Sequence, residues 1–492
     1  MKLTYTGHPF YDVGLATIVA MSEKNGPEEL EESDLEKMAA YIQENYVVNP
    51  LKSFLTVAFP NSGFVQPAYE SQPEKRIEYA QVVSQAYQQD DFLDEIDPFN
   101  GLPVPKVRYS LKNEIPLGYA FREHVPLLTG HGYINFHAEA NNGLPLSGVS
   151  LLIFQALPMG CFKVSGKLLA VHSDDATILQ KFAAQALLFN RKAVLAAKAA
   201  QEKKMPENER HARTLLIEKL SEIEQQRKDL PDETPATLTA YHFSNSGQGA
   251  ELTIYPLPME VGDFLRSLLR NPKYETSWKA LVQRGWQLVK SKKSDTLPQY
   301  NRLYEDLFNL PENAGSFIST YLLRRPTRQR STDDPTTTYT LHKEANLISW
   351  DLTNLFLRKV LKMEKNRIEQ IRILADALAD YISQENDQRL FTRLLYVKRY
   401  DDLRIALIKA SQASVRLGKP PLVTLDGFVE VFEVGNDLPY ADWKLGRDLL
   451  LIRLIEQLYQ KSWLQPNVDQ LPVESDEPDH PEKNFFERRI ET

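Results

Sequence analysis

The feature that most constrains the fold is a helical repeat of apolar residues in the C-terminal part of the chain. In the stretch NRIEQIRILADALADYI these residues recur every three or four positions: Ile368, Ile371, Leu374, Leu378, Tyr381 and Ile382. This spacing forms one apolar face of an α-helix, which has to be buried against other helices. Further helical segments follow, among them WKLGRDLLLIRLIEQLYQ, with a loop around 418–421. The sequence therefore predicts a C-terminal helical bundle.

The first 170 residues have a different pattern, in which short helical and strand-like pieces alternate with Gly and Pro turns. Strands and one short apolar helix are indicated, at Gly132–Phe136, Leu151–Ala156 and Lys167–His172. Residues 175–228 indicate two exposed helices separated at Met205–Pro206. Residues 238–258 indicate a hairpin with its turn at Ser246–Gly249. We expect an α+β fold, with short sheets and helices in a mixed N-terminal domain followed by the bundle.

Three parts of the chain are expected from these patterns: a mixed α+β domain at 1–345, the bundle at 346–464 and an acidic tail at 465–492. The polar, Pro-interrupted stretch at 324–340 is expected to be a mobile loop near the domain boundary. The tail has four prolines among acids and little apolar content, which predicts disorder.

Composition narrows the classes of function. Apolar residues make up 42% and charged residues 25% of the chain, as in ordinary folded proteins. The sequence has no apolar run of about 18 residues that could span a membrane, and it opens without a secretion signal. The single cysteine, Cys161, excludes an intramolecular disulfide and a multi-cysteine zinc site. We expect a cytoplasmic protein with no membrane partner and no metal or other cofactor.

Charge is distributed unevenly along the chain. The net charge is −8, and residues 465–492 hold eight acids against three bases. Residues 388–419 hold only two acids, Asp401 and Asp402, against eight bases: Arg389, Arg393, Lys398, Arg399, Arg404, Lys409, Arg416 and Lys419. Two further basic clusters occur in VKSKKS and RRPTRQR: Lys290, Lys292 and Lys293, and Arg324, Arg325 and Arg328. Such asymmetry favours a polyanionic partner.

Aromatic residues accompany the bases in QRLFTRLLYVKRYDDLRIALIK. Arg389 and Arg393 are one helical turn apart, and Arg404 follows. These cations can neutralise phosphates, while aromatic side chains can stack on unpaired bases; the aromatics here are Phe391, Tyr396 and Tyr400. The alternative is a solvated charged face with the same aromatics in the core.

A second polar segment, NPLKSFLTVAFPNSGFVQPAY, has side chains suited to reading base edges. They are Asn49, Lys52, Ser53, Asn61, Ser62, Gly63 and Gln66. Asn and Gln can pair with adenine in the major groove. Asn-Ser-Gly is also a common turn sequence, so a purely structural role is the alternative.

The chain opens with TGHPFYDVGLATIVA, which places His8 and Asp12 before an apolar run. Asp12 is placed to cap a helix that begins at Val13, so we interpret the motif as a buried fold element. An RNA contact by Thr6 or His8 is the alternative. No H-E-x-x-H or G-x-S-x-G motif occurs, and we expect no catalytic residue. The alternative function is a metal-dependent nuclease that uses His131 and His137, or the segment His172–Asp175.

Four features together resemble the large subunit of the type I-B CRISPR Cascade effector, over most of the chain. They are TGHPFYDVGLATI, FPNSGF, GYINFHAEANNGLPLSGVSLLIFQALPMG and the helical C-terminal region. Some relatives carry a cysteine-rich metal motif in the middle of the chain. The stretch PKVRYSLKNEI has no cysteine here, so no zinc is expected.

The resemblance implies a non-catalytic scaffold that holds the 5′ handle end of the crRNA, reads a protospacer-adjacent motif (PAM) in double-stranded DNA and helps the guide to pair. Implied partners are crRNA, target DNA, the backbone, handle-binding and small subunits, and a recruited helicase-nuclease or transposition factors. The segment from Asn49 to Gln66 would lie on the PAM side, and the basic clusters along the DNA strands. The bundle resembles the small subunit, and Met363 is a candidate start for an internally translated one.

Overall fold

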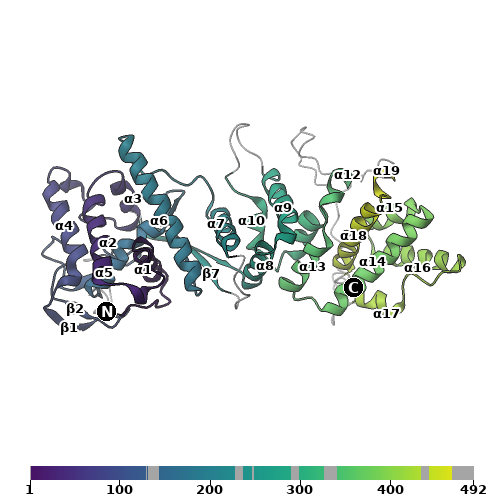
Figure 1. The fold of residues 1–492 in the computed structure, drawn as a ribbon, viewed down its shortest axis with the longest axis horizontal. Coiled ribbons are helices and arrows are strands. Elements are labelled where there is room, and N and C mark those ends of the chain that lie inside the picture. The colour runs from purple at the N-terminus through teal and green to yellow at the C-terminus, as the bar shows by residue number, and fades with distance from the viewer. Residues whose placement is uncertain are drawn as a thin grey trace, which may run out of the picture. The chain divides into compact units, whose positions relative to one another are not determined.

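The chain has an α+β fold in the computed structural model, as the sequence predicts (Figure 1). The structure describes residues 2–128, 130, 143–227, 236–245, 249–289, 299–325, 341–433 and 443–467. It divides into two compact units, residues 1–313 and 314–492. The expected boundary after residue 345 falls inside the second unit, in which Phe317 stacks on Phe356 with 5.0 Å between ring centroids.

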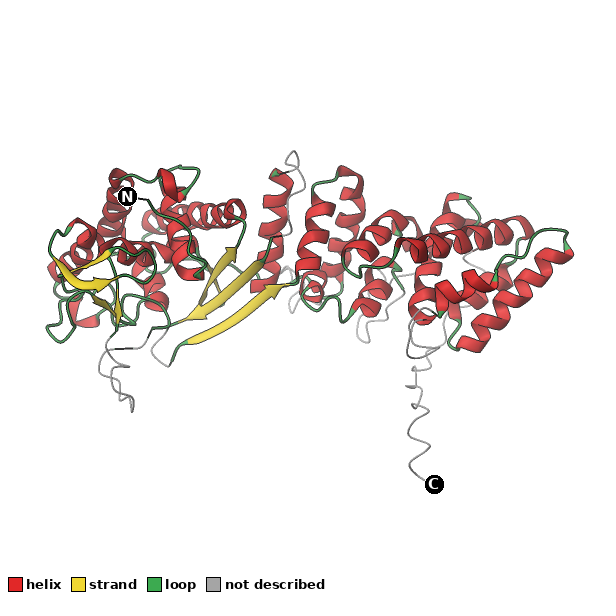
Figure 2. Ribbon diagram, turned by 90° about the horizontal axis from the view of Figure 1, so that it is seen from below, coloured by secondary structure: helices red, strands yellow, loops and turns green. Residues whose placement is uncertain are grey.

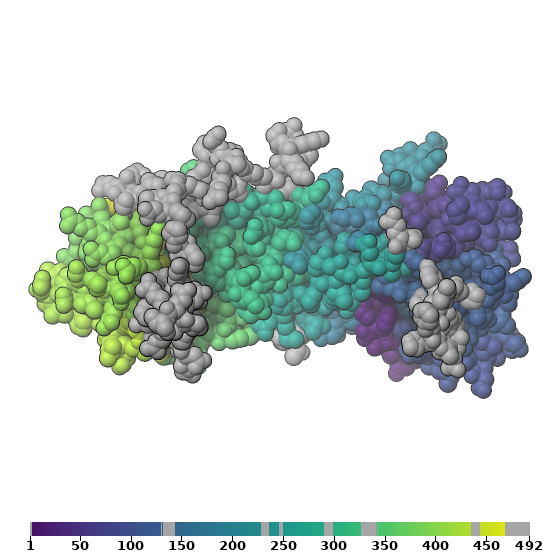
Figure 3. Space-filling view, turned by 180° about the vertical axis from the view of Figure 1, so that it is seen from behind, coloured from purple at the N-terminus to yellow at the C-terminus, as the bar shows by residue number. Residues whose placement is uncertain are grey.

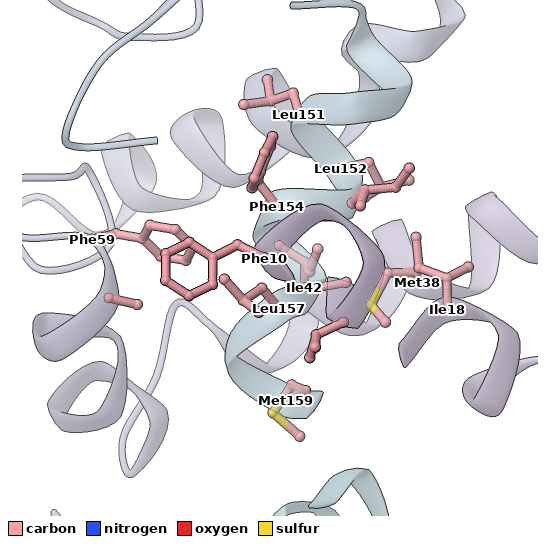
Figure 4. Close-up of a cluster of buried hydrophobic side chains, with 14 of the residues drawn as sticks. Phe10, Ile18, Met38, Ile42, Phe59, Leu151, Leu152, Phe154, Leu157 and Met159 are labelled. Atoms are coloured by element: carbon pink, nitrogen blue, oxygen red, sulfur yellow. The ribbon is translucent and has the colours of Figure 1, made fainter. Parts of the chain in front are cut away.

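The core of the first unit is built around α1 (Pro9–Met21), which is buried along most of its length. α1 packs on α5 (Gly148–Ala156), on the short helix η4 (Leu157–Gly160) and on α6 (Ala176–Ala199). Figure 4 shows Phe10 of α1 beside Phe59, and Ile18 of the same helix beside Met38. In the space-filling view the purple start of the chain shows as a small area between teal and blue residues (Figure 3). The interpretation of the opening motif as a buried fold element is confirmed for the helix from Phe10 onward, whereas Thr6, Gly7 and His8 are exposed.

The remaining helices of this unit are α2 (Glu32–Asn45), α3 (Leu51–Ala58), α4 (Pro73–Gln85), α7 (Ala212–Gln226), α8 (Met259–Leu269), α9 (Glu275–Gln287) and α10 (Arg302–Leu307). The two helices predicted within 175–228 are α6 and α7. Their description as exposed is wrong, because each buries an apolar face, with Phe182 on α6 and Ile217 on α7. The apolar helix predicted near residue 151 is α5.

An antiparallel sheet of four strands lies in the first unit (Figure 2). Its order is β5 (Phe162–Val164), β6 (Lys167–Ser173), β7 (Leu238–Ser244) and β8 (Glu251–Leu257). The predicted strand at 167–172 and the predicted hairpin are confirmed, with Leu238 paired to Leu257 and Ser244 to Glu251. Two short ladders join β1 (Phe92–Ile96) to β2 (Pro103–Pro105) and β3 (Tyr119–Ala120) to β4 (Leu144–Pro145). The predicted strand Gly132–Phe136 and turn residues 246–248 lie outside the described residues.

The second unit consists of helices joined by loops in the residues that the structure describes. They are α11 (Ala314–Phe317), η6 (Ile318–Leu322), α12 (Leu341–Glu344), η8 (Ala345–Leu347), α13 (Trp350–Lys359), α14 (Lys365–Glu385), α15 (Gln388–Tyr396), α16 (Tyr400–Arg416), α17 (Leu425–Phe432), α18 (Trp443–Gln460) and α19 (Leu464–Asn467). The apolar stripe from Ile368 to Ile382 is buried on α14, which packs on α18. This confirms the predicted helix.

The last described helix, α19, runs three residues into the expected tail, and the tail beyond Asn467 lies outside the described residues. Among the helices that the structure describes, none is both long and apolar enough to cross a membrane.

Candidate nucleic-acid interface

The opening motif pins the N-terminal segment to α1 and to the sheet. The helix begins at Pro9 and His8 is its N-cap, whose Nδ1 accepts a hydrogen bond from the Tyr11 amide. The prediction that Asp12 caps a helix starting at Val13 is therefore wrong. The Asp12 carboxylate instead accepts hydrogen bonds from the amides of Thr6 and Gly7, at 2.8 Å each, and pairs with His172 Nε2 at 3.0 Å. Thr6 is held by the same carboxylate.

The residues proposed for the nuclease alternative have other partners. His172 pairs with Asp12, and Asp175 caps α6 and pairs with Arg227 at 3.0 Å. His131 and His137 lie outside the described residues. Within the described ranges, no group of three or more His, Cys, Asp and Glu residues could hold a metal ion. No observation in these parts of the chain favours the nuclease.

The polar segment at 49–66 is partly exposed and partly buried. Asn49 and Asn61 are exposed, whereas Ser62 and Gly63 are buried. A Cβ atom at Gly63 would lie 2.2 Å from the Tyr79 ring, so this glycine allows the loop to pack on α4. The structure thus gives Ser62 and Gly63 a packing role and leaves Asn61, with φ of 64°, as the outward side chain of the turn.

The other polar members of this segment make local contacts. Ser53 Oγ donates to the Pro50 carbonyl at 2.8 Å, and Gln66 is half-buried at the start of a short helical turn. Asn61 borders a cavity of about 150 Å³ together with Lys112 and Arg122. Arg122 donates to the Asn245 carbonyl at 2.7 Å, which fixes its guanidinium group at this cavity.

Lys52 lies within a group of cations around one carboxylate, here called the Glu70 cluster: Lys52, Glu70, Arg76 and Lys203. The hydrogen bond and charge of Lys52 hold the pKa of Glu70 below its ordinary value, with further contributions from Arg76 and Lys203. Arg76 Nε and Nη2 make no hydrogen bond to any residue in the described ranges. The cluster therefore has more cations than Glu70 neutralises. Sequence reasoning missed Lys203 because the loop after α6 is distant along the chain.

The residues of the two predicted basic clusters at 290–293 and 324–328 are only partly described by the structure. Lys290, Lys292, Lys293 and Arg328 lie outside the described residues. Arg324 is 4% exposed and pairs with Glu344, so its predicted place on a DNA path conflicts with its burial in the second unit. Arg325 is partly exposed and pairs with Asp448 at 3.0 Å.

The three arginines predicted on the bundle are all exposed. Arg389 and Arg393 lie on α15, one turn apart, and Arg404 lies on α16. None of the three forms an ion pair with a residue that the structure describes. Arg404 also borders an open groove of about 670 Å³ with Arg416.

The aromatic residues of this region belong to the core. Phe391 is fully buried and packs edge-on against Trp463, with 5.6 Å between centroids. Tyr400 is buried against Trp443, and Tyr396 is half-buried. The interpretation of Phe391 and Tyr400 as base-stacking platforms is therefore wrong, since their rings fill the space between helices.

Met363 lies in the connection between α13 and α14, where its amide donates to the Leu357 carbonyl at 2.9 Å. A product that starts there would keep α14 to α19 and lose α13. Such a product would also lose a hydrogen bond between α13 and α18, in which the Trp350 amide donates to Glu456 Oε1 at 2.8 Å.

Comparison with known proteins assigns the chain to no family. No protein-family model matches the sequence, and no curated protein matches it either.

Proposed function

We propose that this chain is the non-catalytic large subunit of a CRISPR RNA-guided complex of the type I-B Cascade kind. In that role it acts in the cytoplasm with crRNA and the other subunits, recognises a PAM in double-stranded DNA and supports R-loop formation. The sequence resemblance supplies the identity of the complex. The surface of α15 and α16 is the observation that carries the nucleic-acid contact.

Unpaired charge on α15 and α16 supports this role. Arg389, Arg393 and Arg404 point outward without an ion-pair partner among the described residues. An exposed guanidinium group without an ion-pair partner is free to contact a phosphate, and this contact releases counterions that are condensed on the nucleic acid. Because the neighbouring aromatic rings are buried, we expect this surface to hold the backbone and not to stack on bases.

The exposed part of the 49–66 segment supports a PAM-side contact. Asn61 offers an amide on a turn beside Arg122, at a cavity that Lys112 and its ion-pair partner Glu123 also line. Lys52 of the same segment belongs to the Glu70 cluster, which has more cations than Glu70 neutralises. A short polar side chain that reads a base edge beside cations that hold phosphates is the usual division of labour in protein–DNA contacts.

The backbone contact is tested by replacing Arg389, Arg393 and Arg404 together with Ala in the assembled complex. Each lost phosphate contact lowers the slope of log affinity against log salt by about 0.9, so we expect a decrease of about 2 to 3. Affinity should fall equally for targets with different flanking sequences. The control is Arg358→Ala with Lys365→Ala, two exposed bases on α13 and α14. An unchanged slope would return the three arginines to an ordinary solvated surface.

The base contact is tested with Asn61→Ala and Lys52→Ala against target DNA with randomised flanks. Asn61→Ala should reduce discrimination between flanking sequences, and Lys52→Ala should weaken binding to all of them. Lys106→Ala is the control for Lys52, since Lys106 is another lysine paired with a carboxylate, at 3.7 Å from Asp91. If Asn61→Ala keeps full selectivity, the reader lies elsewhere.

A further inference from the structure

A small cavity in the second unit is surrounded by positive charge. Its volume is about 60 Å³, and four cationic residues line it: Arg325, Lys398, Lys444 and Arg447. They come from three parts of the chain, namely the segment after η6, the connection after α15 and the start of α18. No acidic residue of the described ranges lines this cavity.

Hydrogen bonds to Asp448 and to the Val397 carbonyl fix the positions of the two arginines. Arg447 is 7% exposed, its Nη1 donates to the Val397 carbonyl at 2.7 Å, and its Nε donates to Asp448 Oδ1 at 2.9 Å. The same carboxylate oxygen accepts from Arg325 Nη2 at 3.0 Å. Asp448 therefore orients both guanidinium groups. Lys398 and Lys444 are exposed at the rim.

Size and charge together define the ligand that this cavity suits. The cavity is small, at about 60 Å³, and therefore suits a compact group better than an extended one. A phosphate group is compact and anionic, and planar guanidinium groups bind its oxygens through paired hydrogen bonds. Four cations that converge on so small a space favour an occupant that carries negative charge.

We infer that this cavity binds one phosphate group of a nucleic-acid backbone. Arg325 and Arg447 contact its oxygens, and Lys398 and Lys444 close over it from the rim. The source of the phosphate rests on the proposed function, whereas the site itself rests on the geometry above. Lys398 lies two residues after the end of α15, the helix that carries Arg389 and Arg393.

The site is tested first without nucleic acid, on the full-length chain. Binding of inorganic phosphate is measured by the broadening of its ³¹P resonance, with chloride at equal ionic strength as the reference. The variant is Lys398→Ala with Lys444→Ala, which leaves the buried arginine network intact. The control is Arg358→Ala with Lys365→Ala, which removes two exposed bases elsewhere in the unit. We expect the rim variant to weaken phosphate binding at least tenfold and the control to leave it unchanged. Absence of phosphate binding, or equal weakening in both variants, would overturn the site.

The source of the phosphate is tested with the same variants and short oligonucleotides. The rim variant should lower the salt slope of oligonucleotide binding by about 1, because it weakens the contact to one phosphate. An oligonucleotide in which a neutral methylphosphonate replaces the phosphate at one position should bind the natural chain as weakly as the unmodified oligonucleotide binds the rim variant. The same replacement should not weaken binding to the rim variant any further. Phosphate binding with an unchanged salt slope would overturn the assignment to a nucleic-acid backbone. If phosphate binds here but the assembled complex captures no target DNA, the proposed function fails and the phosphate site stands.

Discussion

Replacing Gly14 with Ala should destabilise the first unit, because this glycine lets α1 touch the backbone of α5. A Cβ atom at position 14 would lie 2.2 Å from the Ile153 carbonyl oxygen, where ordinary van der Waals contact begins at 3.4 Å. The clashing atom belongs to the backbone of a buried helix and cannot rotate away. α1 and α5 would have to separate by roughly 1 Å, and most of the surrounding core would have to follow.

The size of the effect follows from two opposing terms. Overpacking a close-packed core costs about 1 to 3 kcal/mol, and a clash with fixed backbone belongs at the upper end. Alanine recovers about 1 kcal/mol over glycine through its higher helix propensity. We therefore expect Gly14→Ala to lower the free energy of unfolding by about 2 kcal/mol. With about 2.1 cal/mol/K of unfolding entropy per residue, the first unit, residues 1–313, should then lose about 3 °C in Tm.

Gly262 provides the matched control, since it also lies within a helix, α8. A Cβ atom there would be 3.8 Å from its nearest neighbour, the Ala236 carbonyl oxygen. Gly262→Ala should therefore gain the helix propensity without the clash and raise the Tm by about 1 to 2 °C. Thermal unfolding of the full chain measures both, and amide hydrogen exchange in α1 and α5 locates the change. If Gly14→Ala is as stable as the natural chain, the close approach of the two helices is wrong.

Two further predictions concern pH and translation. His124 is fully buried, with Nε2 donating to the Tyr109 carbonyl and Nδ1 accepting from the Phe121 amide, and burial lowers its pKa from the ordinary value of 6.5. As the pH decreases, the unfolded chain therefore binds this proton before the folded chain does. The free energy of unfolding should decrease at pH values under about 6.5, by at most about 1.4 kcal/mol per pH unit. Urea unfolding of the natural chain and of His124→Gln across that range should show a weaker pH dependence in the variant. Expression of the intact gene with a C-terminal tag should yield a second, shorter species that starts at or near Met363 and co-purifies with the complex, and silent recoding of codons 355–363 should abolish it; a full-length product alone would contradict internal initiation.

Local patterns predicted the fold class and most elements because the relevant signals are short-range. The stripe from Ile368 to Ile382 and the strand at 167–172 are where the sequence indicates them. The start of α1 was misplaced although a signal was present, since Pro9 has the fixed φ that favours the first position of a helix. The reach of Asp12 to His172 could not be predicted, because the two residues meet only through the packing of α1 against β6.

The candidate site was predictable where exposure follows from helical spacing and not where it depends on packing. Arg389 and Arg393 share a polar face with the period of a helix, and both are exposed. Arg324 and Arg325 are adjacent in sequence, yet one is buried against Glu344 and the other borders the phosphate-sized cavity. Turn-forming residues such as Ser62 serve equally well inside and outside, so composition alone could not place them.

The arginines of the second unit differ in whether an acid fixes them, and this difference bears on function. Arg372 and Arg453 both pair with Asp376, at 2.9 Å and 2.7 Å, and so join α14 to α18. On α15 and α16 the nearby acids are placed differently. Asp401 and Asp402 lie in the first turn of α16, where their negative charges interact favourably with the positive end of the helix dipole. Neither pairs with a base in the described ranges. All the bases of residues 388–419 except Lys419, which pairs with Glu385, lack an ion pair with any residue that the structure describes. A surface kept charged in this way costs self-repulsion in the free protein, and a polyanion relieves it on binding.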